Sequence, residues 1–227
     1  MSVAVIMTTY QQGEYVGQAV RSVLEQTYED WTLTILDDGS TDGTSDVIEG
    51  LGLWRDSRVT YERLDPTVEE RRATVRYASN LNRGVAQTTG DLLTFLCGDD
   101  FYMPDRLERM VAKISEAGSV VYGPQLMLEG DGRERGVRST SGVLGDAYHR
   151  VDLNSVMLIR QCFDAVGGFP DRPATPELWR EADAQLWRKL TAAGYWFHPV
   201  DGPEATDCKR YLDSGVDARV IAGKEPW

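Results

Sequence analysis

Short apolar runs alternate along this chain with segments in which apolar residues recur every three to four positions. The apolar runs predict buried strands at residues 3–7, 31–36, 59–64, 91–96, 119–122 and 155–159. The three-to-four spacing predicts helices around residues 19–24, 42–51, 75–87, 103–114 and 178–193, with Asp42 as an N-cap and Pro104 near a first helical position. This alternation predicts an α/β fold with a mostly parallel sheet.

Three segments lack a clear period. Residues 66–72 read as a charged loop, and residues 129–150 carry five glycines among charged side chains, which is typical of a mobile excursion. The segment after Pro199 has weak periodicity and predicts no element.

Composition narrows the function classes. The 227 residues include 24 Lys and Arg against 36 Asp and Glu, a formal net charge of −12, which argues against a nucleic-acid partner and against charge-driven binding to anionic lipid. Cys97, Cys162 and Cys208 lack zinc-site or disulfide-framework spacing, which favours a reducing compartment. No apolar run approaches the roughly 18 residues of a membrane span, and no basic leader precedes the first strand. We expect a cytoplasmic protein; the sequence does not indicate its oligomeric state.

Two of the predicted strands end in paired carboxylates. Asp37 and Asp38 follow one strand, and Asp99 and Asp100 follow another. In a parallel sheet both strand ends lie on the same edge, where the like charges call for a cation such as Mg²⁺ or Mn²⁺ and, with it, a diphosphate. The alternative is that both acidic turns are solvated loops and helix caps.

The turn that begins at Asp38 also comes close to an EF-hand calcium loop. Asp38, Ser40, Asp42, Asp46 and Glu49 fall at ligand positions, but a strand rather than a helix precedes them and no second copy exists. We therefore do not expect a calcium loop.

Several motifs together resemble family 2 glycosyltransferases of the GT-A fold over about the first 190 residues. They stand at 5–10 (VIMTTY), 22–27 (SVLEQT), 37–44 (DDGSTDGT), 74–78 (TVRYA), 97–107 (CGDDFYMPDRL) and 155–157 (SVM). The resemblance implies one domain over 1–227, with a Rossmann-like, mostly parallel sheet flanked by helices and a smaller acceptor-side sheet. It places the nucleotide-binding part at about 1–104, the acceptor-binding part at about 105–200 and a tail at 201–227.

The resemblance also implies roles for individual residues. Tyr10 offers a ring face to a pyrimidine base, Asp38 can accept its imide N–H, and Arg71 can donate to a carbonyl. The implied nucleoside-binding residues are Thr8, Tyr10, Asp38 and Arg71, with Asp99 at the ribose and metal region and Asp100 as the ligand of Mg²⁺ or Mn²⁺.

The segment 180–187 (READAQLW) resembles the part of inverting members that carries the catalytic base. Aligning Leu186-Trp187 with the family's Leu-Trp places Asp183 as that base, and Glu181 is a competing candidate. The chain departs from the family where Cys97 replaces a common acidic residue and Ala182 a common Glu. These departures put metal affinity and the orientation of the base in question.

The expected function is metal-dependent, inverting transfer of a sugar from a UDP- or dTDP-sugar to a hydroxyl or amine acceptor. A catalytically degenerate domain that binds nucleotide-sugars is one alternative. A sugar-phosphate nucleotidyltransferase is another, although residues 8–13 lack the Lys or Arg of its phosphate loop. His149 and His198 lack metal-ligand spacing and read as structural, with an acceptor-side role left open for His149.

Overall fold

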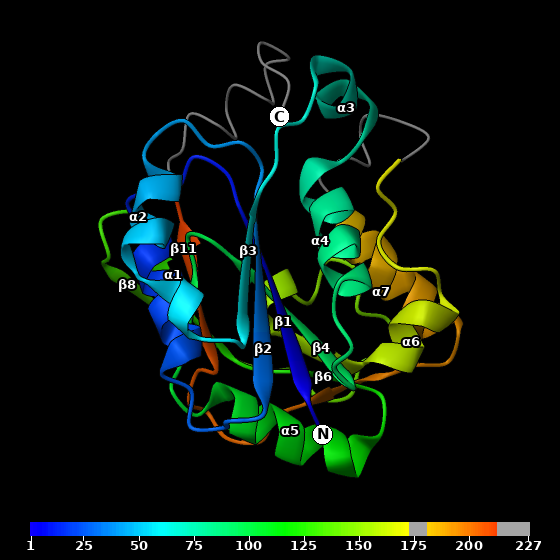
Figure 1. Ribbon diagram of the computed structural model, residues 1–227. Coiled ribbons are helices and arrows are strands. Elements are labelled where there is room, and N and C mark those ends of the chain that lie inside the picture. The colour runs from blue at the N-terminus through cyan, green and yellow to red at the C-terminus, as the bar shows by residue number, and fades with distance from the viewer. Residues whose placement is uncertain (173–180, 213–227) are drawn as a thin grey trace.

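The computed structural model describes residues 1–172 and 181–212, and its centre is a seven-stranded sheet (Figure 1). The strand order is β10 (Phe197–Pro199), β6 (Val120–Tyr122), β9 (Val156–Ile159), β4 (Leu92–Cys97), β1 (Val3–Thr9), β2 (Trp31–Asp37) and β3 (Val59–Arg63). All neighbours are parallel except β9, which runs antiparallel to β4 and β6. The predicted α/β class and mostly parallel sheet are confirmed.

A second, four-stranded sheet lies beside the first. Its order is β5 (Phe101–Tyr102), β11 (Asp207–Tyr211), β7 (Gln125–Glu129) and β8 (Glu134–Arg138). The strand β11 pairs antiparallel with β5 and parallel with β7, so it joins the segment after Asp100 to the middle of the chain. This is the smaller sheet that the resemblance implies.

Helices cover both faces of the central sheet because alternate strand residues point to opposite sides. Val3, Val5 and Met7 of β1 pack with one set of helices, whereas Ala4 and Ile6 pack with the other. Figure 1 shows the two layers: α1 (Val16–Leu24), α2 (Thr44–Gly50) and α5 (Arg106–Ala117) on one face, and α4 (Arg76–Ala86), α6 (Arg160–Ala165) and α7 (Ala182–Ala192) on the other. Short 3₁₀ turns lie at Leu53–Arg55 (η1) and Leu153–Ser155 (η2).

The predicted charged loop at 66–72 is wrong, because it contains the helix α3 (Val68–Ala73). Thr67 Oγ1 accepts the Glu70 N–H at 3.1 Å, and Glu70 Oε2 accepts the Thr67 N–H at 2.7 Å, which makes a capping box. None of its residues is buried. The helix is therefore held by its cap and by charges, so it has no apolar stripe that a periodicity argument can detect.

The region 129–150 is also more ordered than predicted. The strand β8 forms a hairpin with β7, and the side chains of Leu144 and Ala147 belong to the core. Leu144 exchanges backbone hydrogen bonds with Phe197 of β10. The sequence pattern did not reveal this order, because the few buried positions are separated by glycines and by exposed charged residues.

Several element boundaries differ from the predictions. The N-cap of α2 is Gly43, at φ 90°, rather than Asp42. The helix α5 begins at Arg106 with Asp105 as its N-cap, so Pro104 lies before the helix rather than at its first position. The tail after Pro199, for which the sequence predicts no element, supplies β11. Residues 178–180 of the predicted last helix lie outside the described residues; the described part begins at Ala182.

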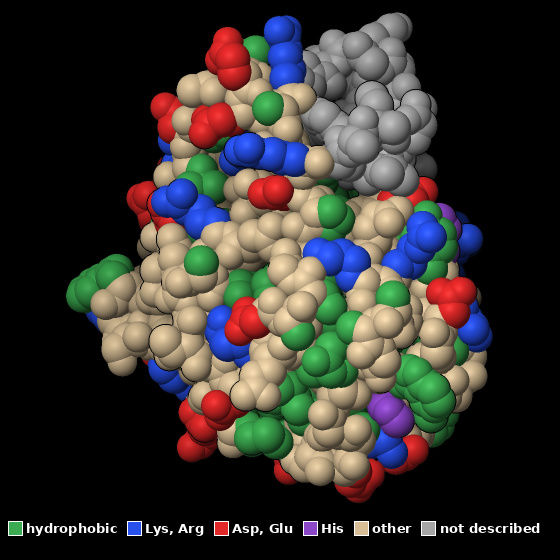
Figure 2. Space-filling view, turned by 90° about the vertical axis from the view of Figure 1, so that its right-hand side faces the viewer, with side chains coloured by type: hydrophobic (Ala, Val, Ile, Leu, Met, Phe, Trp, Pro, Cys, Tyr) green, Lys and Arg blue, Asp and Glu red, His purple; other side chains and the backbone are tan. Residues whose placement is uncertain are grey.

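Figure 2 shows the face covered by α4, α6 and α7, where acidic and basic side chains are interspersed and apolar ones lie between them. Charge therefore singles out no binding surface on this face. Among the described residues, no helix is both long enough and apolar enough to cross a bilayer.

Candidate active site

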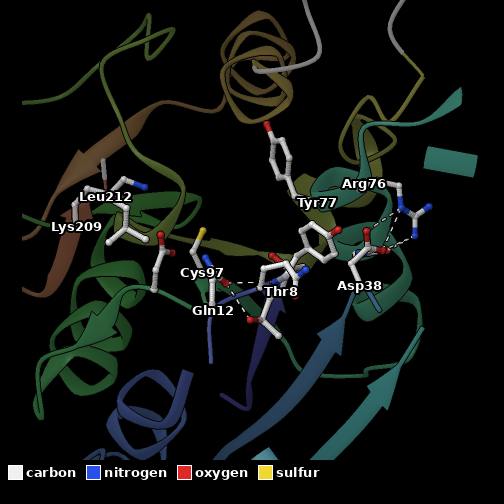
Figure 3. Close-up of a pocket in the computed structure, with 13 residues that line it drawn as sticks. Thr8, Gln12, Asp38, Arg76, Tyr77, Cys97, Lys209 and Leu212 are labelled. Atoms are coloured by element: carbon white, nitrogen blue, oxygen red, sulfur yellow. Dashed lines mark hydrogen bonds and ion pairs between the residues drawn. The ribbon is translucent and has the colours of Figure 1, made fainter. Parts of the chain in front are cut away.

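The two acidic turns meet at the carboxyl edge of the central sheet. β1 pairs with both β2 and β4, with Thr9 opposite Asp37 and Thr8 opposite Cys97, so both strand ends flank the end of β1. A first pocket of about 280 Å³ opens there. Its lining residues are Thr8, Thr9, Tyr10, Gln11, Gln12, Asp38, Arg76, Tyr77, Asn80, Cys97, Asp99, Lys209 and Leu212 (Figure 3).

The three carboxylates of the first acidic turn have separate tasks. Asp37 is fully buried and builds the turn, because its Oδ1 accepts the N–H and hydroxyl of Ser40 and its Oδ2 accepts the hydroxyls of Ser45 and Tyr61. Asp42 accepts the Gly13 N–H at 3.0 Å and so fixes the loop after β1. A strand, β2, precedes the turn, in agreement with the rejection of an EF-hand.

Asp38 lines the first pocket, but its carboxylate is engaged by cations. Arg76 donates to Asp38 Oδ1 from Nη2 at 2.7 Å and from Nε at 3.1 Å, and Asn80 Nδ2 donates to the same oxygen at 2.9 Å. Arg71 Nη1 donates to Asp38 Oδ2 at 3.0 Å. Asp38 thus anchors a polar cluster at one end of the pocket, visible beside Arg76 in Figure 3.

Tyr10 and Arg71 lie at the same end as Asp38, whereas Thr8 lies between the two ends of the pocket (Figure 3). Thr8 and Tyr10 line the pocket directly. The Arg71 guanidinium lies over the Tyr10 ring, 4.8 Å from its centroid, and contacts Asp38 through both its side chain and the Asp38 carbonyl. Arg71 therefore holds two pocket residues in place, so Tyr10, Asp38 and Arg71, three of the four residues assigned to the nucleoside, lie together.

The second acidic turn lies at the other end of the pocket. The Asp100 carboxylate is buried: Oδ1 accepts the Arg210 N–H at 2.6 Å, and Oδ2 accepts from Asn154 Nδ2 and lies 3.4 Å from Lys209 Nζ. Burial raises the pKa of Asp100 to about 8. The nearby Asp99 and Asp152 carboxylates raise this pKa further, and the opposite effect of Lys209 is smaller than these effects together. Burial likewise raises the pKa of Asp99.

These carboxylates fit a hard divalent cation. The potential ligand atoms of Cys97, Asp99 and Asp100 lie within 4.8 Å of one another. The two carboxylates match the oxygen preference of Mg²⁺ and Mn²⁺, whereas the Cys97 thiol does not, and burial raises its pKa well above the usual value. The raised carboxyl pKa values mean that a bound cation would relieve unfavourable charge. Asp99 and Asp100 are therefore the residues that would hold the metal.

Gly98 allows this turn to approach the end of β1. A Cβ at this position would lie 2.5 Å from both Thr9 Oγ1 and Gln12 Oε1. Gly98 N–H also donates to the Thr8 carbonyl at 3.0 Å. A side chain at this position would therefore push the acidic turn away from the end of β1.

A second pocket, lined by Arg138, His149, Val151, Asp152, Glu181, Asp183 and Ala184, lies next to the first. Two contacts join them. The Asp183 N–H donates to Tyr77 Oη at 3.3 Å, and Lys209 Nζ lies 3.6 Å from Asp152 Oδ2. Because Tyr77 and Lys209 line the first pocket, these contacts show that the two pockets are neighbours, so groups bound in them would lie close together.

Asp183 and Glu181, the two base candidates, both line the second pocket but differ in their surroundings. Burial raises the pKa of Asp183 to about 6, and Asp152 adds to the effect. Glu181 accepts a hydrogen bond from Tyr148 at 2.5 Å and pairs with His149 Nε2 at 3.4 Å, and the Tyr148 hydrogen bond lowers its pKa. Asp183 has the greater proton affinity and fewer competing partners, which suits a general base.

The sequence interpretation did not assign five polar residues that the structure places in or beside these pockets: Arg76, Asn80, Asp152, Asn154 and Lys209. A signal existed for two of them. Arg76 and Asn80 stand four apart on α4, hence on one face, and Arg76 lies inside the 74–78 motif. Lys209 belongs to the tail that predicted no element, so no pattern pointed to it.

Comparison with known proteins identifies the family. The family model described as Glycosyl transferase family 2 matches residues 4–168. The chain belongs to this family. The match ends before α7 and β11, so Asp183 and Lys209 lie outside it.

Two curated relatives illustrate the likeness. Protein CgeD of Bacillus subtilis is 31% identical over 198 residues, covering 83% of this chain and 46% of the relative. The uncharacterized glycosyltransferase alr2836 of a Nostoc species is 30% identical over 192 residues, covering 83% of this chain and 56% of the relative. The chain thus spans about half the length of these relatives.

Solved structures establish the GT-A fold. Residues 1–349 of S. aureus TarS in complex with UDP-GlcNAc superpose with a TM-score of 0.70 at 18% identity, covering 94% of this chain and 60% of that fragment. The mannosyltransferase PcManGT of Pyrobaculum calidifontis, in complex with GDP-Man and Mn²⁺, gives 0.67 at 16% identity, covering 96% and 59%. The expected fold, with its Rossmann-like sheet and smaller second sheet, is confirmed.

Proposed function

We propose that this chain transfers a sugar from a UDP- or dTDP-sugar in the first pocket to a hydroxyl or amine acceptor in the second, with inversion of the anomeric carbon and a divalent cation. The observation that carries the proposal is the placement of Asp183, a carboxylate with a pKa of about 6, in a pocket that adjoins the family's nucleotide edge.

The donor assignment rests on the two ends of the first pocket. Tyr10, Asp38 and Arg76 offer an aromatic face, an acceptor and donors to a pyrimidine nucleoside, while Asp99 and Asp100 lie at the other end. The TarS structure contains UDP-GlcNAc and the PcManGT structure contains GDP-Man, which supports a nucleotide-sugar for this chain.

Asp99 and Asp100 would hold the cation, Mg²⁺ or Mn²⁺. When bound, it would stabilise the negative charge that develops on the leaving diphosphate. The neighbour solved with Mn²⁺ supports the presence of a cation, although not its identity here. The replacement of an acidic residue by Cys97 leaves two carboxylates in the turn, so we expect modest cation affinity.

Asp183 takes the proton from the acceptor. An ionised carboxylate in the second pocket removes the acceptor proton as the nucleophile attacks the anomeric carbon, and the diphosphate leaves from the opposite face. A single displacement of this kind inverts the configuration. Ala182, which stands where the family often has Glu, is fully buried and offers no polar group to orient the base. The Tyr77 hydroxyl contacts this segment, since it accepts the backbone N–H of Asp183.

A thermal-shift panel of UDP, dTDP and GDP, with and without Mn²⁺, tests the donor assignment. We expect UDP or dTDP to stabilise the chain in a Mn²⁺-dependent way, by about 2.7 kcal/mol at a ligand concentration 100 times Kd. GDP serves as the control for the base. If neither pyrimidine diphosphate stabilised the protein, the proposal would fail.

Slow release of UDP from UDP-sugars in the absence of acceptor, followed by chromatography, tests catalysis separately. If the chain bound the nucleotide but did not cleave UDP-sugars to release UDP, it would instead be a catalytically degenerate domain that binds nucleotide-sugars. Formation of a nucleotide-sugar from a sugar phosphate and a nucleoside triphosphate would indicate the nucleotidyltransferase.

A further inference from the structure

Lys209 places a positive charge inside the first pocket. Its side chain is 27% exposed, and its Nζ lies 3.4 Å from Asp100 Oδ2 and 3.6 Å from Asp152 Oδ2. Figure 3 shows Lys209 and Leu212 on the side of the pocket opposite Asp38 and Arg76, with Thr8, Gln12 and Cys97 between them. Lys209 therefore lies at the end assigned to the diphosphate.

The strand β11 holds Lys209 firmly in this position. The neighbouring residue Arg210 donates its N–H to Asp100 at 2.6 Å, and its Nη1 donates to the Asp99 carbonyl at 2.8 Å. Its guanidinium also lies over the Tyr15 ring, 4.6 Å from the centroid. These contacts fix the backbone on one side of Lys209 against the acidic turn, so that only its side chain has freedom to move.

The charge balance gives this ammonium group a task. Asp99 lines the end of the pocket where a diphosphate would bring further negative charge, and the Asp100 and Asp152 carboxylates lie within 3.6 Å of Lys209 Nζ at this end. Without a cation, the three carboxylates would repel the ligand, and interactions between charges are strong in a partly buried site. Among the described residues that line this pocket, Lys209 is the only lysine, and it lies in the pocket rather than on the outer surface.

If Lys209 had only a structural role, that role would be to neutralise the Asp100 carboxylate. That role does not require exposure to the pocket, because Asn154 and the Arg210 N–H already donate to both Asp100 oxygens. The ammonium also lies beside Asp100, one of the two carboxylates that would hold the divalent cation, and two cations repel. Lys209 therefore has reason to turn from Asp100 toward a ligand in the pocket.

We propose that Lys209 is a diphosphate-binding residue of the donor site, which binds the phosphate oxygens of the nucleotide even without a divalent cation. This inference rests on the proposed function. It extends that function by adding a residue from β11, beyond the segment that matches the family model, to the recognition of the leaving group.

The test compares UDP with uridine by isothermal titration calorimetry in EDTA. We expect the native chain to bind UDP about tenfold or more tightly than uridine, and Lys209→Met to reduce this ratio to about twofold. Lys209→Arg should retain most of the ratio because it keeps the charge. Lys113→Met is the matched control, since Lys113 pairs with Asp201 at 2.9 Å on the surface; it should leave the ratio unchanged.

Melting temperatures and circular dichroism of each variant identify a folding defect, and Lys209→Arg then decides the question. A native UDP-to-uridine ratio in Lys209→Met, or a ratio near one in the native chain that binds UDP with Mn²⁺, would overturn the inference and leave the proposed function standing. Failure of the native chain to bind UDP and dTDP under any condition would overturn both.

Discussion

The two ends of the first pocket treat buried negative charge in opposite ways. At the end proposed to bind the nucleoside (the nucleoside end), Asp38 is surrounded by Arg71, Arg76 and Asn80, and its carboxylate oxygens accept several charge-assisted hydrogen bonds. At the end proposed to bind the diphosphate (the diphosphate end), Asp99 and Asp100 have raised pKa values because desolvation outweighs the cations near them.

This difference indicates which end is complete before a ligand arrives. The nucleoside end is a closed network whose removal would affect folding, since its charges are matched within the chain. At the diphosphate end and at the adjoining Asp183, the carboxyl groups have raised pKa values because their ionised forms are incompletely stabilised by the chain. Such shifts are typical of groups that act on a ligand or a proton. Substitutions at the first end should lower stability, and substitutions at the second should lower turnover.

The largest effect is expected from Asp183→Asn. Turnover should fall by about 10³-fold because the amide cannot accept the acceptor proton, while UDP affinity and melting temperature should change little. The measurement is UDP release in the presence of acceptor, or donor hydrolysis in its absence. Glu181→Gln is the matched control; a larger loss in that variant would reassign the base.

Asp38→Asn should destabilise the chain by about 3 kcal/mol, because it removes the negative charge that pairs with two largely buried guanidinium groups. Urea unfolding followed by circular dichroism measures this. Asp56→Asn, which breaks the more exposed pair with Arg58, is the control and should cost less than about 1 kcal/mol. Equal losses would contradict the view that the nucleoside end is a folding element.

Turnover should depend on pH through Asp183. With a pKa of about 6, the carboxylate is ionised and active above that value, and turnover should fall about tenfold for each pH unit below it. A pH series of saturated turnover measures the limb. An acid limb near 4 instead would indicate that burial does not govern this group in the working complex.

The smallest effect is expected from Arg71→Ala. The change removes a cation over the Tyr10 ring and one of the partners of Asp38, but Arg76 and Asn80 remain, so we expect a loss of nucleotide affinity of about threefold. Calorimetry with UDP and with uridine should show the same loss. A loss confined to UDP would place Arg71 at the diphosphate.

The fold and the acidic edge could be predicted from the sequence because both depend on local pattern. Buried parallel strands give continuous apolar runs, and β2 and β4 end in carboxylates that parallel pairing with β1 brings together. Thr8, Tyr10, Asp38 and Asp99 lie in one pocket as predicted, and Asp183 lies in the next. Their roles in binding and catalysis stay predictions.

The remaining features depend on contacts between distant segments. Asn154 reaches Asp100 across 54 positions and Lys209 across 109, and neither distance in sequence leaves a local pattern. The helix α3 escaped prediction for the opposite reason, since it has no buried residue and begins with a capping box. Periodicity detects burial, so it misses elements that rest on caps and long-range charge pairs.

The position of β11 in the second sheet bears on how the protein is made and shortened. The nucleotide edge cannot be completed during synthesis until residues 207–211 have left the ribosome, because β11 supplies both the Lys209 and Arg210 contacts to the acidic turn. A fragment cut at the end of the family match, residue 168, would lose the strand between β5 and β7. Expression fragments should therefore extend at least through Leu212.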